Sequence, residues 1–146
     1  MKRISILFVI ILSLFILSSC SKIETKNKED YIDMLYNYHT LGKKDTACID
    51  LRTLNEYGKG HLKGYINYNF ENGSSEEFII FVTNIYNKDT YIFLIDESGE
   101  YVNIASKLLK DEGYKHIVIY EEGYNSLVEY ASNYILVVEG TDDCGC

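Results

Sequence analysis

A strand, a short acidic loop and a helix follow one another between Tyr91 and Leu109, and this run constrains the fold more than any other stretch. Residues 91–95 are apolar and predict a buried strand. Beyond the loop, apolar residues recur at helical spacing, at Val102, Ala105, Leu108 and Leu109. In an open α/β sheet, ligands bind beyond the carboxyl ends of the strands, where the next helix presents unpaired N–H groups. We therefore expect a site in the loop 96–101.

This loop is unusually acidic for an anion-binding site. It consists of Asp96, Glu97, Ser98, Gly99, Glu100 and Tyr101 and contains no Cys, His, Lys or Arg. Carboxylates at this spacing suit Ca²⁺ or Mg²⁺, but the loop has fewer ligands than a dedicated cage needs. We therefore expect a solvated acidic loop with no bound metal and no cofactor.

The N-terminus predicts export and lipidation. Lys2 and Arg3 precede an apolar run over residues 4–17, which has the length of a signal-peptide core and is short for a membrane span. The run ends in Leu-Ser-Ser-Cys at Cys20, which resembles the lipobox of bacterial lipoproteins. We therefore expect residues 1–19 to be a signal peptide, with a plain secretory signal as the alternative. Diacylglyceryl and palmitate chains on Cys20 would then hold the protein on the extracytoplasmic face of a cell-envelope membrane.

Composition divides the rest of the chain into three parts. Residues 20–29 are polar and rich in Lys and Glu, and predict a lipidated tether. Residues 30–139 have enough apolar sequence for one folded domain, and its first helix is expected to run from an N-cap at Asp30 to near Gly42. Residues 140–146 form a tail that contains cysteine.

Charge restricts the partners that this chain can bind. The first 19 residues contain two cations and no acid, so their removal changes the formal net charge from −8 to −10. A charge of this sign argues against nucleic acid and against attraction to anionic lipid head groups. The expected partners are the membrane, through the anchor at Cys20, and a protein of the cell envelope.

The remaining cysteines differ in their surroundings. Cys48 lies in an apolar strand and is expected to be a small buried side chain. Cys144 and Cys146 form a Cys-Gly-Cys tail, which fits a strained disulfide, a pair of ligands for a soft metal, or a free dithiol.

Two further helices and three further strands are expected. Ser74 and Glu77 fit a capping box that opens a helix whose inner face contains Phe78, Val82 and Ile85. The apolar runs 46–51 and 116–120 predict strands, and a shorter strand is expected at 65–68. Gly123 introduces a last helix.

Arg52, the only arginine after residue 19, follows the strand at 46–51. Its spacing allows an ion pair with Asp50 or Glu56 that would fix the following turn. His61 lies between turn glycines, and we expect it to hydrogen-bond the backbone because no second His or Cys lies nearby to complete a metal site.

These residues belong to a longer pattern. The stretch 49–70 resembles the first signature of the rhodanese-like domain family. The matching residues are Asp50, Arg52, Glu56, Tyr57, Gly60, His61, Gly64, Ile66 and Asn67. The closing signature is matched at Gly113, Tyr114, Gly123 and Tyr124, with Glu122 and Leu127 replacing the usual Gly and Trp. The resemblance covers residues 32–138 and implies an α/β fold with a mostly parallel five-stranded sheet flanked by helices on both faces.

The resemblance also implies where the chemistry of active relatives would lie. In active members, a cysteine in the loop after the central strand takes sulfur from thiosulfate or another donor as a persulfide. That position falls on Asp96, and positions that are commonly basic fall on Glu97 and Tyr101. We therefore expect no rhodanese activity through this loop and a non-catalytic binding module. The alternative is a sulfurtransferase or thiol-redox protein that uses Cys144 or Cys146.

Overall fold

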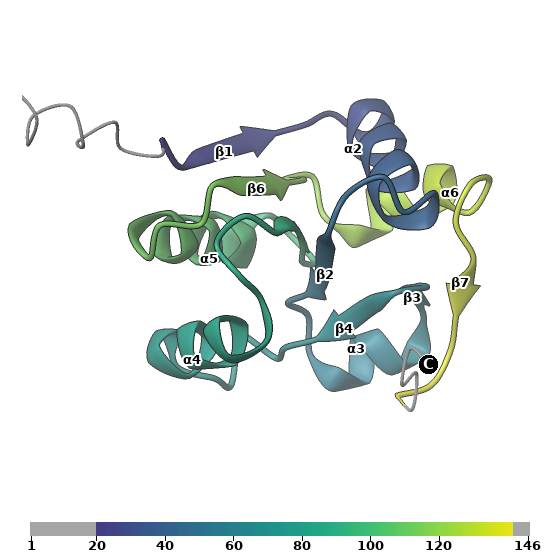
Figure 1. The fold of residues 1–146 in the computed structure, drawn as a ribbon. Helices are drawn as coiled ribbons and strands as arrows, with labels where there is room; N and C mark the ends of the chain where they lie inside the picture. The colour runs from purple at the N-terminus through teal and green to yellow at the C-terminus, as the bar shows by residue number, and fades with distance from the viewer. Residues whose placement is uncertain (1–19, 142–146) are drawn as a thin grey trace, which may run out of the picture.

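The computed structural model describes residues 20–141 (Figure 1), so the expected signal peptide and both tail cysteines lie outside the described residues. Its main sheet has five parallel strands in the order β1-β6-β5-β2-β4. The strands are β1 (Lys22–Thr25), β2 (Thr46–Asp50), β4 (Tyr65–Asn67), β5 (Tyr91–Ile95) and β6 (His116–Ile119). Strand β3 (His61–Leu62) and strand β7 (Val137–Val138) form a separate antiparallel pair.

Helices cover both faces of the sheet (Figure 1). They are α2 (Lys28–Leu35), α3 (Leu54–Lys59), α4 (Ser75–Ile85), α5 (Glu100–Asp111) and α6 (Tyr124–Ala131). Apolar residues of α2, α3 and α6 pack on one face, and those of α4 and α5 pack on the other. The predicted α/β architecture is confirmed.

The central strands are buried on both sides, as parallel strands between two helical layers require. In β5, Phe93 and Ile95 belong to one core cluster, while Ile92 and Leu94 belong to the other. This burial on both faces explains why the central strands are continuous apolar runs, in which apolar and polar residues do not alternate.

The start of the domain differs from the expected tether over residues 20–29. Residues 22–25 form β1, which pairs with β6 at the edge of the sheet. Helix α2 then begins after Asn27, whose side chain accepts a hydrogen bond from the backbone N–H of Asp30. The prediction of an N-cap at Asp30 is therefore wrong, and the continuation of this helix is the π-helical segment η1 (Tyr36–Thr40).

Two other predictions need correction at their boundaries. The capping box of Ser74 and Glu77 opens α4 as expected, but Ile85 is 56% exposed and does not belong to its inner face. The loop after β5 ends at Gly99, because Glu100 and Tyr101 already form the first turn of α5. Within residues 20–141, no helix is both long enough and apolar enough to span a bilayer.

Candidate functional site

The carboxyl ends of β2 and β5 lie side by side, and each strand leads directly into a buried carboxylate. Asp50 ends β2 and is in register with Ile95, the last residue of β5. Asp96 follows immediately, and the backbone of Leu51 donates a hydrogen bond to the carbonyl of Ile95. Asp50 and Asp96 are almost wholly buried, with exposed fractions of 1% and 0%.

The Asp96 side chain points inward and is held by the backbone of its own loop. One carboxylate oxygen accepts a hydrogen bond from the N–H of Gly99 at 2.5 Å. The other accepts from the N–H groups of Tyr101, at 2.6 Å, and Val102, at 3.2 Å. These donors belong to the first turn of α5, where the helix dipole also favours negative charge. The carboxylate therefore occupies an anion cradle built from the loop and the helix start.

Glycines allow a second loop to close over this cradle. Gly99 has φ +88°, and a Cβ placed on it would lie 2.1 Å from the carbonyl oxygen of Glu121. Gly123 has φ +82° and approaches the carbonyl of Glu97 in the same way. The N–H of Tyr124 also donates to the Asp96 carbonyl at 2.8 Å. Backbone-to-backbone packing thus fixes the loop after β5 against the loop after β6.

Arg52 neutralises the other buried carboxylate. Its guanidinium donates to both oxygens of Asp50, with Nη2 2.7 Å from Oδ2, and to the Gly60 carbonyl at 2.8 Å. The guanidinium carbon also lies 3.4 Å from the centroid of the Tyr124 ring, a cation–π contact. Burial alone would lower the pKa of Arg52, but the hydrogen bonds and charge of Asp50 outweigh it and raise that pKa. Of the two expected partners, Asp50 is therefore the one that pairs with Arg52.

Glu56 has a different role from the one considered for it. Its carboxylate accepts hydrogen bonds from the backbone N–H and the hydroxyl of Thr53, at 3.0 and 2.6 Å, as part of a capping box that opens α3. These hydrogen bonds lower the pKa of Glu56 below its ordinary value of 4.5. The signal for this box, Thr-x-x-Glu, is present in the sequence, but α3 itself was not predicted.

The other residues of the first signature stabilise the turn that follows β2. Nδ1 of His61 lies 3.0 Å from the Tyr57 carbonyl, so this histidine hydrogen-bonds the backbone as expected, although it is buried and begins β3. The rings of Tyr57 and His61 stack at 3.6 Å. Asn67 donates from its side-chain amide to the carbonyls of Asp50 and Arg52. Gly64 has φ +90°, and the His39 ring lies where a Cβ would project. These residues therefore have a structural role in the turn after β2.

A cavity of about 390 Å³ opens beside the loop. It is lined by Arg52, Glu56, Lys59, Gly60, Glu97, Tyr124, Asn125, Val128 and Val137. Glu97 is exposed at its rim and accepts a hydrogen bond from the Asn125 amide. Desolvation and the nearby carboxylates of Glu56 and Asp50 raise the pKa of Glu97. The cavity is therefore lined by the buried guanidinium of Arg52, the carboxylates of Glu56 and Glu97, and the exposed Lys59.

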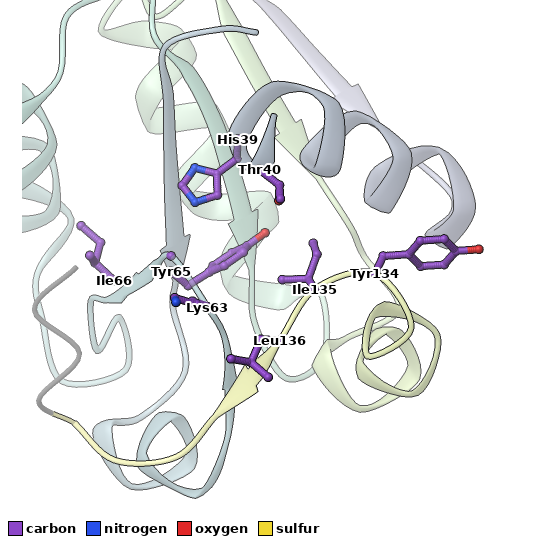
Figure 2. A pocket seen from close by; sticks show the side chains of 9 residues that line it. His39, Thr40, Lys63, Tyr65, Ile66, Tyr134, Ile135 and Leu136 are labelled. Carbon is purple, nitrogen blue, oxygen red and sulfur yellow. The ribbon is translucent and has the colours of Figure 1, made fainter. Parts of the chain in front are cut away.

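A second hollow, of about 460 Å³, shares no lining residue with the first. Figure 2 shows His39 and Tyr65 beside it, with Ile135, Leu136 and Tyr134 on the segment between α6 and β7. Nδ1 of His39 lies 3.0 Å from the Thr46 hydroxyl, and burial lowers the pKa of this histidine. No residue of the acidic loop reaches this hollow.

The thiol of Cys48 lies away from the loop. Cys48 is in the middle of β2, is 2% exposed and is flanked by Tyr65 and Phe93 in the register. Burial raises the pKa of this thiol, so it has no reactive thiolate at neutral pH. Among residues 20–141, no group of three or more His, Cys, Asp or Glu side chains is arranged to hold a metal ion.

Sequence reasoning missed two contributions to the site. It treated Asp96 as part of a solvated loop, whereas the side chain is buried in the cradle. The contact of Tyr124 with Arg52 joins residues far apart in the chain, and no spacing rule could predict it. A carboxylate at the N-terminus of a predicted helix is the signal that could have revealed the first contribution.

Solved structures with the same fold are distant in sequence. The Alr3790 protein from Anabaena sp. is 18% identical, with a TM-score of 0.59 and coverage of 76% of this chain and 80% of that one. Protein hp1203 from Helicobacter pylori is 22% identical, with a TM-score of 0.54 and coverage of 81% and 96%. No curated protein matches this chain.

A thiosulfate sulfurtransferase from Pseudomonas aeruginosa is 17% identical with a TM-score of 0.58. The match covers 80% of this chain and 20% of that enzyme. At such identities the likeness concerns the fold alone. The sequence profile of the rhodanese-like domain matches residues 35–130, which is most of the chain. The chain therefore belongs to the rhodanese-like domain family.

Proposed function

We propose that this chain is a membrane-anchored, non-catalytic rhodanese-like module that binds a partner in the cell envelope. In this proposal, Asp96 takes the position that a nucleophilic cysteine has in active members of the family. The observation that carries the proposal is the set of three backbone N–H groups that converge on the Asp96 carboxylate.

The chemistry of this side chain excludes the sulfur transfer of active relatives. A carboxylate cannot hold a sulfane sulfur as a cysteine persulfide does. Because the Asp96 oxygens already accept the N–H donors, no donor of this set is left for an incoming anion. Glu97 at the rim adds a repulsion of about 1 kcal/mol at surface dielectric against a substrate such as thiosulfate.

The surroundings of the loop favour a partner with basic side chains. Glu97, Glu100, Glu121 and Glu122 are all exposed near the cradle. Opposite charges steer association and contribute more to specificity than to affinity. The closed loop then acts as a rigid part of a binding surface, and the lipid on Cys20 keeps that surface at the membrane.

Thiocyanate release tests the absence of catalysis. The chain with both Cys144→Ser and Cys146→Ser, incubated with thiosulfate and cyanide, is expected to release no more thiocyanate than a heat-treated sample. Release above this control would contradict the proposal, because it would require sulfur transfer through the Asp96 loop.

Anchoring has its own test in cells. The wild-type chain is expected in the membrane fraction, with a mass that includes lipid at Cys20, and the Cys20→Ser variant is expected to leave that fraction. A wild-type chain without lipid at Cys20 would contradict this part of the proposal.

A second candidate function is thiol chemistry by the tail. The N–H of Gly140 donates to the Gly58 carbonyl at 2.9 Å, so the last described residues lie beside α3. Cys144 is three residues beyond Thr141, a span of at most about 11 Å. Since α3 also lines the cavity at the loop, this distance allows a tail thiol to reach its rim. Alkylation of the tail thiols that leaves any sulfurtransferase or disulfide-exchange activity unchanged would exclude this candidate.

A further inference from the structure

The position of Cys20 next to the sheet has a consequence for how an anchored domain is oriented. Strand β1 begins at Lys22, so only Ser21 separates it from Cys20. The N–H of Lys22 donates to the Lys115 carbonyl at 3.0 Å, which fixes the chain from this residue onward. Two residues span at most about 7 Å. A lipid on Cys20 would therefore be held close to the start of β1.

The start of β1 belongs to one end of the parallel sheet. Lys22 is in register with His116 of β6, which is in register with Tyr91 of β5. The N–H of Lys115 donates to the Lys88 carbonyl, so the turn before β5 joins the same end. In Figure 1, β1 and β6 start on the same side of the molecule. We call this the near end, defined by Lys22, Lys88, Asp89 and Lys115.

The Asp96 loop lies at the opposite end of the same strands. It follows β5, whose five residues span about 17 Å. Four exposed carboxylates, of Glu97, Glu100, Glu121 and Glu122, lie there beside two lysines, Lys26 and Lys59. Each lysine of the near end, in contrast, has an acidic partner. The two ends of β5 and β6 therefore differ in charge, the far end being the more acidic.

From these observations we infer that the lipidated domain stands on the bilayer with its near end against the lipid head groups and the Asp96 loop directed away from them. The inference depends on the lipidation of Cys20 proposed above. The short link holds the near end at the membrane. The acidic end is repelled by anionic lipids if the domain tips over, whereas in the upright orientation it lies beyond a Debye length of about 10 Å. The loop is then presented to a partner outside the membrane.

Fluorescence quenching distinguishes the two ends. In the full lipidated chain with Cys144→Ser and Cys146→Ser, one fluorophore is placed at Asp89→Cys or at Glu121→Cys, two exposed acidic positions at opposite ends. The chain is reconstituted in vesicles of phosphatidylethanolamine and phosphatidylglycerol that contain nitroxide-labelled head groups. The label at position 89 is expected to be quenched several-fold more strongly than the label at position 121. Equal quenching, or stronger quenching at position 121, would overturn the inference.

A spacer variant provides the matched control. A Gly/Ser segment of about 20 residues inserted between Ser21 and Lys22 allows the domain to move roughly 25 Å from its anchor. The difference between the two labels is expected to shrink strongly, and an unchanged difference would overturn the role of the short link. Vesicle flotation and the mass at Cys20 are measured first. A chain that carries no lipid and does not float contradicts the proposed anchoring, whereas a floating chain with equal quenching contradicts only the orientation.

Discussion

Asp50 and Asp96 are buried carboxylates at the same edge of the sheet, and the protein compensates their charges in different ways. Asp50 faces the guanidinium of Arg52, a full positive charge from a side chain two residues away. Asp96 faces three backbone N–H groups and the start of α5. The first arrangement is a closed ion pair that stabilises a turn. The second uses backbone N–H groups, which can donate to any anionic group of suitable size, so the identity of residue 96 decides which anion the cradle binds.

The largest effect is expected when the ion pair is broken. Asp50→Asn leaves the Arg52 guanidinium buried without its partner, and the free energy of unfolding should fall by about 3–5 kcal/mol. Urea denaturation measures this change. Asp89→Asn is the control, because it removes an exposed partner of Lys115 and should have little measurable effect. Equal stabilities for the two variants would show that the buried pair contributes nothing beyond a surface pair.

The closure of the loop should be nearly as sensitive. Gly99→Ala adds a Cβ 2.1 Å from the Glu121 carbonyl oxygen at φ +88°, whereas Gly113→Ala has φ +85° with no atom within 4 Å. We expect a loss of about 1 kcal/mol for Gly113→Ala, which reports the backbone strain alone, and of more than about 3 kcal/mol for Gly99→Ala. Thermal or urea unfolding of both variants separates the cost of the positive φ from the cost of the steric clash with the Glu121 carbonyl. Similar losses would contradict the close packing of the two loops.

Removal of the carboxylate from the cradle should have an intermediate effect. Asp96→Ala leaves three N–H groups without their acceptor and should cost about 2 kcal/mol, because water replaces the carboxylate only in part. Asp96→Asn keeps an acceptor oxygen and should cost less. Urea unfolding ranks the three proteins. An Asp96→Ala variant as stable as the wild type would mean that the cradle does not need an anion.

The smallest effect concerns the capping box of α3, at the rim of the site. The hydrogen bonds from Thr53 lower the pKa of Glu56 below 4.5, so its carboxylate stabilises the fold above the ordinary pKa and loses this contribution as the pH falls through the folded pKa. Glu56→Gln should therefore lower stability by less than about 1 kcal/mol near neutral pH, and the difference should shrink at an acidic pH below 4.5, as the carboxylate becomes protonated. Urea unfolding at both pH values measures it. A difference that grows in acid would contradict this sign.

Local patterns predicted much of this fold because its central strands are buried on both faces. The run Tyr91–Ile95 is continuous and apolar, as a strand between two helical layers requires, and the Ser74 capping box marks the start of α4 directly. Strand β1 was missed because Lys-Ile-Glu-Thr is mostly polar. It lies at the edge of the sheet, and only Ile23 among its residues packs against the core.

The site was harder to predict than the fold because a sequence shows which residues are charged but not where their side chains point. Asp96 and Glu97 are adjacent carboxylates, yet one is 0% exposed inside the cradle and the other lies at the rim. Their separation depends on Gly99 and Gly123, which let the two loops touch through their backbones. That contact joins distant parts of the chain and becomes visible only in the structure.

The most direct test of the central claim is sulfur loading of Asp96→Cys in the chain that also carries Cys144→Ser and Cys146→Ser. A thiolate at this position would meet the same N–H donors and the same helix start, which favour its charged form. After incubation with thiosulfate, mass spectrometry should find one added sulfur atom at residue 96 in this variant and none in the matched chain with Asp96. Two results would contradict the claim that the Asp96 carboxylate fills an anion-binding cradle kept from the active members of the family. One is a folded Asp96→Cys variant that takes up no sulfur, and the other is sulfur uptake by the chain with Asp96.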